Sequence, residues 1–152
     1  MEIFDLIEIP ADDFLELKIM LERLIDDFIT VENQFSKKIL IGSSEGKVEL
    51  LLRSEIYCTD EDKKYLTLVI AVISFEQERS GLGTKTVEWL KRYAISKNFD
   101  RLTIENANNE ASIEFAKHLG FTNVLFSQHL KELLGKSESP DYEIFLSLKD
   151  SI

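Results

Sequence analysis

Apolar residues recur with helical spacing in three segments of the chain. Between residues 17 and 28 they share one predicted helix face, at Leu17, Met20, Leu21, Leu24, Ile25 and Phe28. Asp13, with Glu16 three residues later, forms a capping-box pattern at the start of this helix. A second apolar face runs from Thr84 to Lys97, with charged residues on the opposite side. The third helix begins after Asn109, its predicted N-cap, and ends at Gly120.

Strand patterns occupy the intervals between these helices. The segment "KILIGSSEGKVELLLRSEIY" predicts a hairpin with its turn at Ser43–Gly46, and one face of its second strand carries Val48, Leu50, Leu52 and Ile56. Tyr65–Phe75 is apolar on both faces, as in a strand in the middle of a covered sheet. Further strands are expected at Ile3–Ile9, at Leu102–Ile104 and from Phe121 onward. We therefore expect one α/β domain over residues 1–152, with a mixed central β-sheet flanked by helices.

The charge of the chain limits its partners. Its 18 basic and 28 acidic side chains give a formal net charge of −10, and no cluster of Lys or Arg interrupts it. This excludes a general role in following the phosphates of nucleic acid. The charge suits a cationic substrate, and it suits a soluble protein equally well.

Two further features bear on location. The single cysteine, Cys58, excludes a disulfide within the chain, and its acidic neighbours in "IYCTDED" do not favour a nucleophilic role. The N-terminus lacks the basic region of a secretory signal, and the apolar run Leu66–Phe75 is too short for a membrane helix. We therefore expect a cytoplasmic protein without a membrane partner.

The stretch "ERSGLGT", residues 78–84, joins the buried strand Tyr65–Phe75 to the start of a helix. The exposed amides of a helix N-terminus form an anion site, and glycines let phosphate oxygens approach the backbone. An ordinary tight turn is the alternative interpretation. The spacing matches neither a nucleotide P-loop nor a dinucleotide fingerprint, because "GSSEGKV" at 42–48 is one residue short and no third glycine follows Gly83.

Two motifs together resemble the Gcn5-related N-acetyltransferase (GNAT) superfamily. The family's loop pattern, Gln/Arg-x-x-Gly-x-Gly/Ala after a long strand, is matched by "ERSGLG" at 78–83. Its second pattern, Asn-x-x-Ala/Ser before a helix that ends in Leu-Gly-Phe, is matched by "NEAS" at 109–112 and "LGF" at 119–121. The resemblance covers roughly Tyr65–Val124, and the expected fold becomes a single GNAT-like domain.

This resemblance implies acetyl-coenzyme A (acetyl-CoA) as co-substrate and no metal ion. The backbone amides that would bind its pyrophosphate belong to Arg79, Ser80, Gly81, Leu82, Gly83 and Thr84. Backbone groups of Ile73, Ser74 and Phe75 would pair with the pantetheine arm like an added strand. The side chain of Asn109 would hydrogen-bond near the pantetheine amides.

The chain departs from the family pattern at two positions. Glu78 stands where the loop usually has Gln or Arg, and Ala116 stands where many members carry a tyrosine that protonates the leaving thiolate. Among carboxylates that could accept the amine proton, directly or through water, we favour Glu105 at the end of its strand over Glu55 and Glu76.

The function expected from this resemblance is N-acetylation of a primary amine of a small molecule or peptide. The alternative is a non-catalytic acyl-CoA-binding or protein-interaction module of the same fold, and a structural domain without a coenzyme site is a third reading. The amine is not identified by the sequence, and the acidic charge would suit a cationic one. Substrate loops are expected around Glu32–Lys38 and Phe126–Asp141, and a homodimer remains open.

Overall fold

The computed structural model describes residues 7–59, 61–76 and 81–146, which form one mixed α/β unit. Its elements in chain order are the 3-10 helix η1 (Ala11–Phe14), α1 (Leu15–Ile25), β1 (Ile29–Phe35), β2 (Lys38–Ser43), β3 (Val48–Cys58), β4 (Lys64–Phe75), α2 (Leu82–Ser96), β5 (Arg101–Ile104), α3 (Glu110–His118), β6 (Thr122–Leu125), α4 (Gln128–Leu134) and β7 (Glu138–Phe145).

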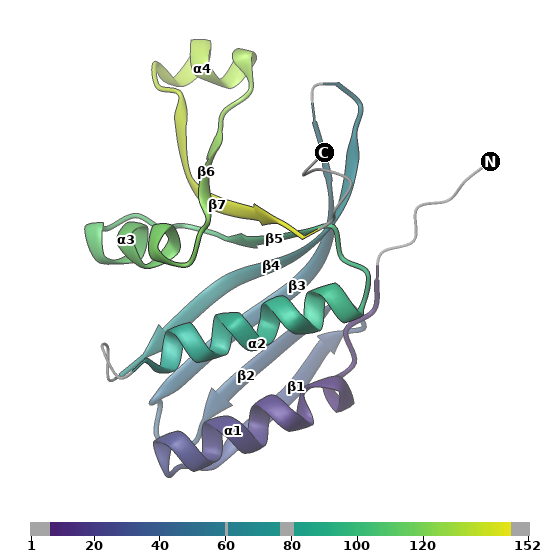
Figure 1. The fold of residues 1–152 in the computed structure, drawn as a ribbon, viewed down its shortest axis with the longest axis vertical. Coiled ribbons are helices and arrows are strands. Elements are labelled where there is room, and N and C mark those ends of the chain that lie inside the picture. Colours follow the sequence, from purple (N-terminus) through teal and green to yellow (C-terminus); the bar gives the residue numbers. More distant parts are fainter. Residues whose placement is uncertain (1–6, 60, 77–80, 147–152) are drawn as a thin grey trace, which may run out of the picture.

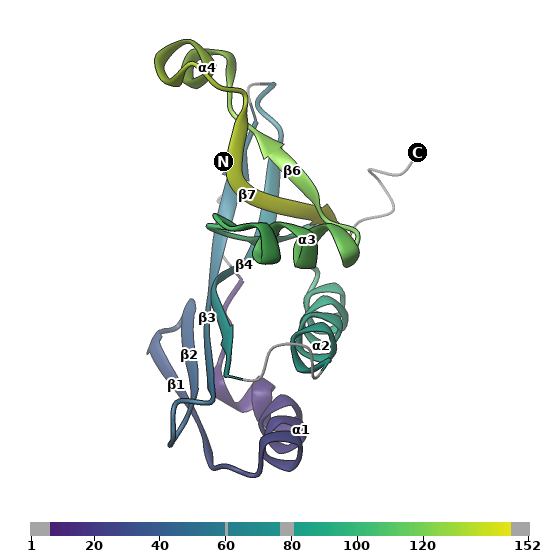
Figure 2. The same cartoon turned by 90° about the vertical axis from the view of Figure 1, so that its left-hand side faces the viewer.

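The strands form one 7-stranded sheet in the order β1-β2-β3-β4-β5-β7-β6. The pair β4–β5 is parallel, and the other neighbouring pairs are antiparallel. Helices α1 and α2 lie against one face of β1–β4 (Figures 1 and 2). The predicted mixed sheet flanked by helices is therefore confirmed.

The core lies between these helices and the covered face of the sheet. Alternate residues of β3, Val48, Leu50 and Leu52, are buried there, and the helices contribute Leu17 and Leu90 among others. The next residue of β3, Arg53, consequently faces the side of the sheet that α1 and α2 leave uncovered.

Three details of the N-terminal half differ from the sequence prediction. The capping box at Asp13 is wrong, because Asp13 lies in η1 and its carboxylate instead accepts a hydrogen bond from the Tyr93 hydroxyl at 2.8 Å. Helix α1 ends at Ile25, so Phe28 is 60 % exposed after it. Residues 7–10 form no strand, and the rest of the predicted strand Ile3–Ile9 lies outside the described residues.

Both segments predicted as substrate loops contain regular structure. Glu32–Lys38 spans the end of edge strand β1 and the turn into β2. Phe126–Asp141 contains α4 and the first half of β7, and Figure 1 shows this arm projecting from the rest of the fold. Helix α4 has 7 residues and none of them is buried.

The sheet opens partway along β4, which has 12 residues. Its pairing with β5 covers only Thr67–Ile70, and the last hydrogen bond runs from the Glu105 amide to the Ile70 carbonyl at 3.0 Å. Beyond that point β4 continues to Phe75, with β3 as its only partner among the described strands, and a bulge at Ala71 shifts the register. Figure 1 shows β5 diverging from β4 here. We call this place the β4–β5 opening.

Asp27 fixes the turn between β2 and β3 from the end of α1. Its carboxylate accepts hydrogen bonds from the Ser44 hydroxyl, from the Glu45 amide at 2.9 Å and from the Phe28 amide at 2.8 Å. These bonds favour the ionised form, and the Ser44 bond contributes most to lowering the pKa of Asp27 from 3.8 to about 2.

Replacing Asp27 with Asn should therefore lower the Tm at pH 7. Because the folded pKa is depressed, the stabilisation by Asp27 is complete above its unfolded value of 3.8 and is lost as the pH falls towards 2. The Tm difference between wild type and Asp27→Asn should accordingly shrink below about pH 4 in thermal melts. Asp26→Asn, at an exposed neighbouring carboxylate, is the control, and a pH-independent difference for Asp27→Asn would contradict the assignment.

Candidate functional site

The N-terminus of α2 lies beside the free end of β4 (Figure 1). Gly81 is its N-cap, with a left-handed φ of 78° and without a side-chain hydrogen bond to cap the helix. No side chain of the described residues caps the first amides of α2, among them those of Leu82 and Gly83, so these offer the donors of a helix N-terminus. Glu78, Arg79 and Ser80, the other predicted loop residues, lie outside the described residues.

Gly81 and Gly83 have different surroundings. A Cβ atom on Gly81 would meet no atom within 4 Å, so only its positive φ disfavours a side chain. A Cβ on Gly83 would lie 3.1 Å from the ring of Phe115 in α3 and 3.6 Å from the ring of Phe75 in β4. Gly83 therefore allows α2, α3 and the end of β4 to pack closely, whereas the sequence suggested an open path for phosphate at both glycines.

The end of β4 has one edge that no other described strand pairs with. The Glu76 amide donates to the Lys47 carbonyl, on the β3 side, at 2.8 Å. Since backbone groups alternate between the two edges of a strand, those of Ser74 also face β3, and those of Ile73 and Phe75 face the β4–β5 opening. The predicted pantetheine segment is thus available for strand-like pairing at Ile73 and Phe75.

The chain beyond β5 turns away from β4 and is held by β7. The Asn106 amide donates to the Asp141 carboxylate at 3.0 Å, and the Ala107 amide donates to the Pro140 carbonyl at 2.7 Å. Asn109 then caps α3 by accepting from the Ser112 amide at 2.8 Å, as predicted. Its Oδ1 atom serves this cap, which leaves its exposed amide group as the donor for a ligand.

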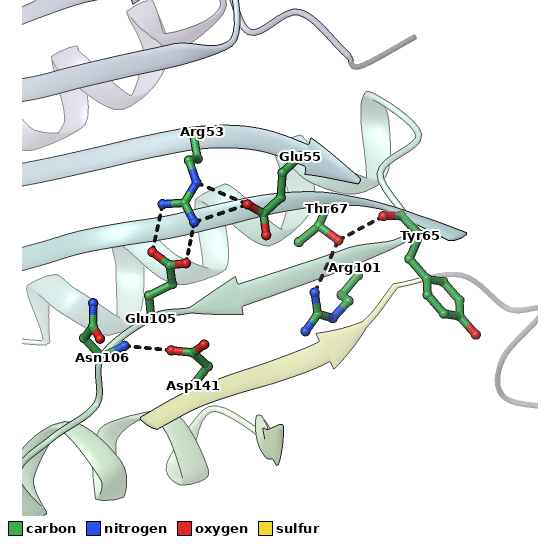
Figure 3. A network of polar contacts seen from close by, with 8 residues as sticks. All are labelled: Arg53, Glu55, Tyr65, Thr67, Arg101, Glu105, Asn106 and Asp141. Carbon is green, nitrogen blue, oxygen red and sulfur yellow. Dashed lines mark hydrogen bonds and ion pairs between the residues drawn. The ribbon is translucent and has the colours of Figure 1, made fainter. Parts of the chain in front are cut away.

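The predicted base, Glu105, lies at the β4–β5 opening in contact with Arg53 of β3 (Figure 3). Arg53 donates from two nitrogens to the two Glu105 oxygens, with a distance of 2.8 Å for the Nη1–Oε1 pair. Its Nε atom also donates to Glu55 at 3.2 Å. The hydrogen bond to Glu105 is the main reason that the pKa of Arg53 is raised, although partial burial opposes it.

Arg53 was missed at the sequence level, although a signal for it existed. The same alternation that puts Leu52 in the core puts Arg53 and Glu55 on the opposite face of β3. Its partner Glu105 is 52 residues away, however, and local periodicity does not predict such a pairing.

Position 116 offers no proton donor. Ala116 is fully buried in the core beneath α3, and His118, two residues on, is exposed.

Among the described residues, no group of His, Cys, Asp and Glu side chains is arranged to hold a metal ion, and no helix is long and apolar enough to span a membrane.

The Arg53–Glu105 pair lines neither of two hollows found among the described residues. One of about 250 Å³ lies between α1, the end of β4 and the start of α2, and is lined by Leu24, Ile25, Asp26, Lys47, Glu76, Leu82 and Lys85. The other, of about 570 Å³, is lined by Ala107, Asn108, Ile113, Lys136, Ser137, Glu138, Ser139, Pro140 and Tyr142.

Comparison with known protein families tests the family resemblance of the segments 78–83 and 109–121. The model of the acetyltransferase (GNAT) family matches residues 46–121. The chain belongs to the GNAT family. The match contains the end of β4, the glycine loop at the start of α2, and α3, so the GNAT segment includes both sides of the β4–β5 opening.

Solved structures of low identity share the fold. A structure described as the KacTA–DNA complex is 14 % identical, with a TM-score of 0.55 over 89 % of this chain and 78 % of that chain. NAA60 of Arabidopsis thaliana, in complex with acetyl-CoA, is 14 % identical, with a TM-score of 0.51 over 93 % of this chain and 98 % of its own. A mutant AtaT toxin bound to the C-terminus of the antitoxin AtaR is 12 % identical, with a TM-score of 0.52 over 90 % and 79 %.

These likenesses show the GNAT fold alone, because all three identities are low. A search of curated protein sequences gave no match.

The close approach of Gly83 to the Phe115 ring predicts that substitutions at these two positions are energetically coupled. Gly83→Ala should gain up to about 1 kcal/mol of helix propensity, but the new Cβ would press on the Phe115 ring. In a Phe115→Leu background that pressure is relieved, so the same alanine should stabilise the protein. Denaturant unfolding of wild type, both single variants and the double variant measures the coupling, expected at about 1 kcal/mol or more. Additive free energies would contradict the close packing.

Proposed function

We propose that this GNAT protein transfers an acetyl group from acetyl-CoA to a primary amine of a small molecule or peptide. The observation that carries the proposal is the β4–β5 opening, where the unpaired edge of β4 leads to the uncapped start of α2. An extended polar chain that ends in phosphates fits this arrangement. Strand-like pairing suits the amides of pantetheine, and a helix N-terminus suits a pyrophosphate.

The residues of the chain would divide the binding of acetyl-CoA between them. Backbone amides of Arg79 to Thr84, with Gly81, Leu82 and Gly83 at the helix start, would hold the pyrophosphate. Backbone groups of Ile73 and Phe75, the two residues of the predicted segment 73–75 that face the opening, would pair with the pantetheine arm, supported by the Asn109 amide. The bound thioester supplies the acetyl group, and the chain supplies orientation and a place for the amine proton.

Glu105 is our candidate for accepting that proton, directly or through a water. A protonated amine must become neutral before its nitrogen attacks the thioester carbonyl. The new C–N bond then forms, the C–S bond breaks, and the sulfur leaves as a thiolate that takes the second amine proton. Because Ala116 carries no hydroxyl, this last proton would pass without a side-chain acid from that position.

The net charge of −10 favours a cationic amine as acceptor over a polyanion such as nucleic acid. Two proteins of similar fold are described in complexes with macromolecules, KacTA with DNA and AtaT with the C-terminus of an antitoxin, so a macromolecular partner is the alternative to a small amine. A non-catalytic acyl-CoA-binding or protein-interaction module is the second candidate function, and buried Ala116 is the observation that favours it.

The first experiment tests whether the protein binds acetyl-CoA. Acetyl-CoA at about 100 times its Kd should stabilise the protein by roughly 2.7 kcal/mol, which thermal melts detect as a rise in Tm. Gly81→Val should abolish this rise, since a side chain would project into the proposed phosphate site. Gly135→Val is the matched control, because Gly135 also has a positive φ and open surroundings but caps α4.

The second experiment tests whether the protein transfers the acetyl group to an amine. Thiol release from acetyl-CoA should appear with at least one member of a panel of free N-terminal peptides, lysine-containing peptides, polyamines and aminosugars. A Tm rise without thiol release would favour the non-catalytic module. An unchanged Tm at millimolar acetyl-CoA would overturn both candidate functions.

A further inference from the structure

Arg53 contacts two carboxylates that come from different strands. Glu55 is two residues away on β3, whereas Glu105 follows β5 on the far side of β4 (Figure 3). The three side chains, which we call the Arg53 cluster, therefore cross the uncovered face of the sheet over Val69 of β4, which is fully buried. The cluster ends where β5 leaves β4, on the face opposite α1 and α2.

The two contacts of Arg53 differ in geometry. Glu105 receives a fork, with one guanidinium nitrogen on each carboxylate oxygen, and such a pair fixes the plane and direction of the carboxylate. Glu55 accepts only through Oε2, at 3.2 Å from both nitrogens that reach it. Arg53 thus orients Glu105 more strictly than Glu55.

The cluster retains both charge and access. Two carboxylates share one guanidinium, which leaves a formal charge of −1. The side chains of Arg53, Glu55 and Glu105 are 32 %, 38 % and 23 % exposed, so a solute can reach them from the uncovered face. Each carboxylate oxygen of Glu105 uses one acceptor site for Arg53 and has a second one for another donor.

We propose that Arg53 is a positioning and specificity residue for the transfer step. Its fork holds the Glu105 carboxylate at the β4–β5 opening in the direction from which it can take the amine proton. The remaining negative charge of the Arg53 cluster attracts the ammonium group of the acceptor. This inference rests on the proposed acetyltransferase function and specifies the acceptor as an amine that arrives protonated and without a neighbouring carboxylate.

A purely structural role would give a different set of effects. The fork also braces β3 against β5, and loss of a brace would lower stability and activity together. A second arginine–glutamate pair on the same face allows the two roles to be separated. Arg101 of β5 donates to Glu143 of β7 at 2.7 Å, with its side chain 4 % exposed and stacked 3.8 Å from the Tyr57 ring.

The experiment compares kcat, KM, Tm and acetyl-CoA affinity in four variants, using the panel amine with the highest kcat/KM. Arg53→Lys keeps the charge but loses the fork, so kcat should fall roughly 10–100-fold with KM within about twofold of wild type. Arg53→Gln loses the positive charge and the fork, so kcat should fall by the same factor as in Arg53→Lys. Because the two carboxylates are then no longer neutralised, KM should drop roughly two- to fivefold. Glu55→Gln removes the net charge, so KM should rise by a similar factor while kcat stays nearly constant.

Arg101→Lys is the matched control, which should lower Tm and leave kcat within about twofold. All variants should bind acetyl-CoA as wild type does. Equal losses of kcat in Arg53→Lys and Arg101→Lys, or wild-type kinetics in Arg53→Lys, would overturn the role of Arg53 while the acetyltransferase function stands. A wild-type protein that acetylates no panel amine would instead overturn the proposed function, and this inference with it.

Discussion

After Ile70 no described strand pairs with one edge of β4, and the rest of the candidate site is arranged around this unpaired edge. Unpaired strand groups require hydrogen bonds from water, ligand or protein. Here β5 cannot supply them, because the bonds from Asn106 and Ala107 tie its continuation to β7. The hydrogen bonds that the chain after β5 makes with β7 therefore keep the β4–β5 opening. The bulge at Ala71 shifts the register of β4 just beyond its last pair with β5.

The two faces of the sheet serve different purposes around that opening. On the covered face, Gly83 lets α2 approach the Phe115 ring closely enough to bring the helix N-terminus beside the end of β4. On the uncovered face, the charged side chains of Arg53 and Glu105 meet across β4 without entering the core. Strand alternation thus keeps apolar packing on the covered face and places the charged pair on the uncovered one.

The elements that the sequence predicted best are those whose signals are local. The strand Tyr65–Phe75, the helix Thr84–Lys97 and the cap at Asn109 each depend on neighbouring residues, and all three are present, although the helix begins two residues earlier, at Leu82. Strand β1 was missed because only Ile29 of its residues is buried, which leaves a polar edge strand without an apolar alternation. The loop residues Arg79 and Ser80 lie outside the described residues, so their predicted role stays a prediction.

Interactions between distant residues account for the other differences. Asp13 looked like a helix cap because Glu16 follows it, but its carboxylate meets Tyr93, 80 residues away. Gly83 looked like a residue needed for ligand approach, and its close neighbour Phe115 became apparent only in three dimensions. Sequence periodicity places a side chain on a face, and it does not say which side chain from another element will face it.

The arm that carries α4 has a consequence for the motions of the molecule. A 7-residue helix without a buried residue has little tertiary packing to offset the entropy of ordering it, even with Ser127 as its cap. Its Leu133 and Leu134 are 67 % and 53 % exposed. Helix α4 would therefore unravel and re-form while the sheet stays intact, and its amide protons would exchange with solvent through local opening long before those of β3 and β4.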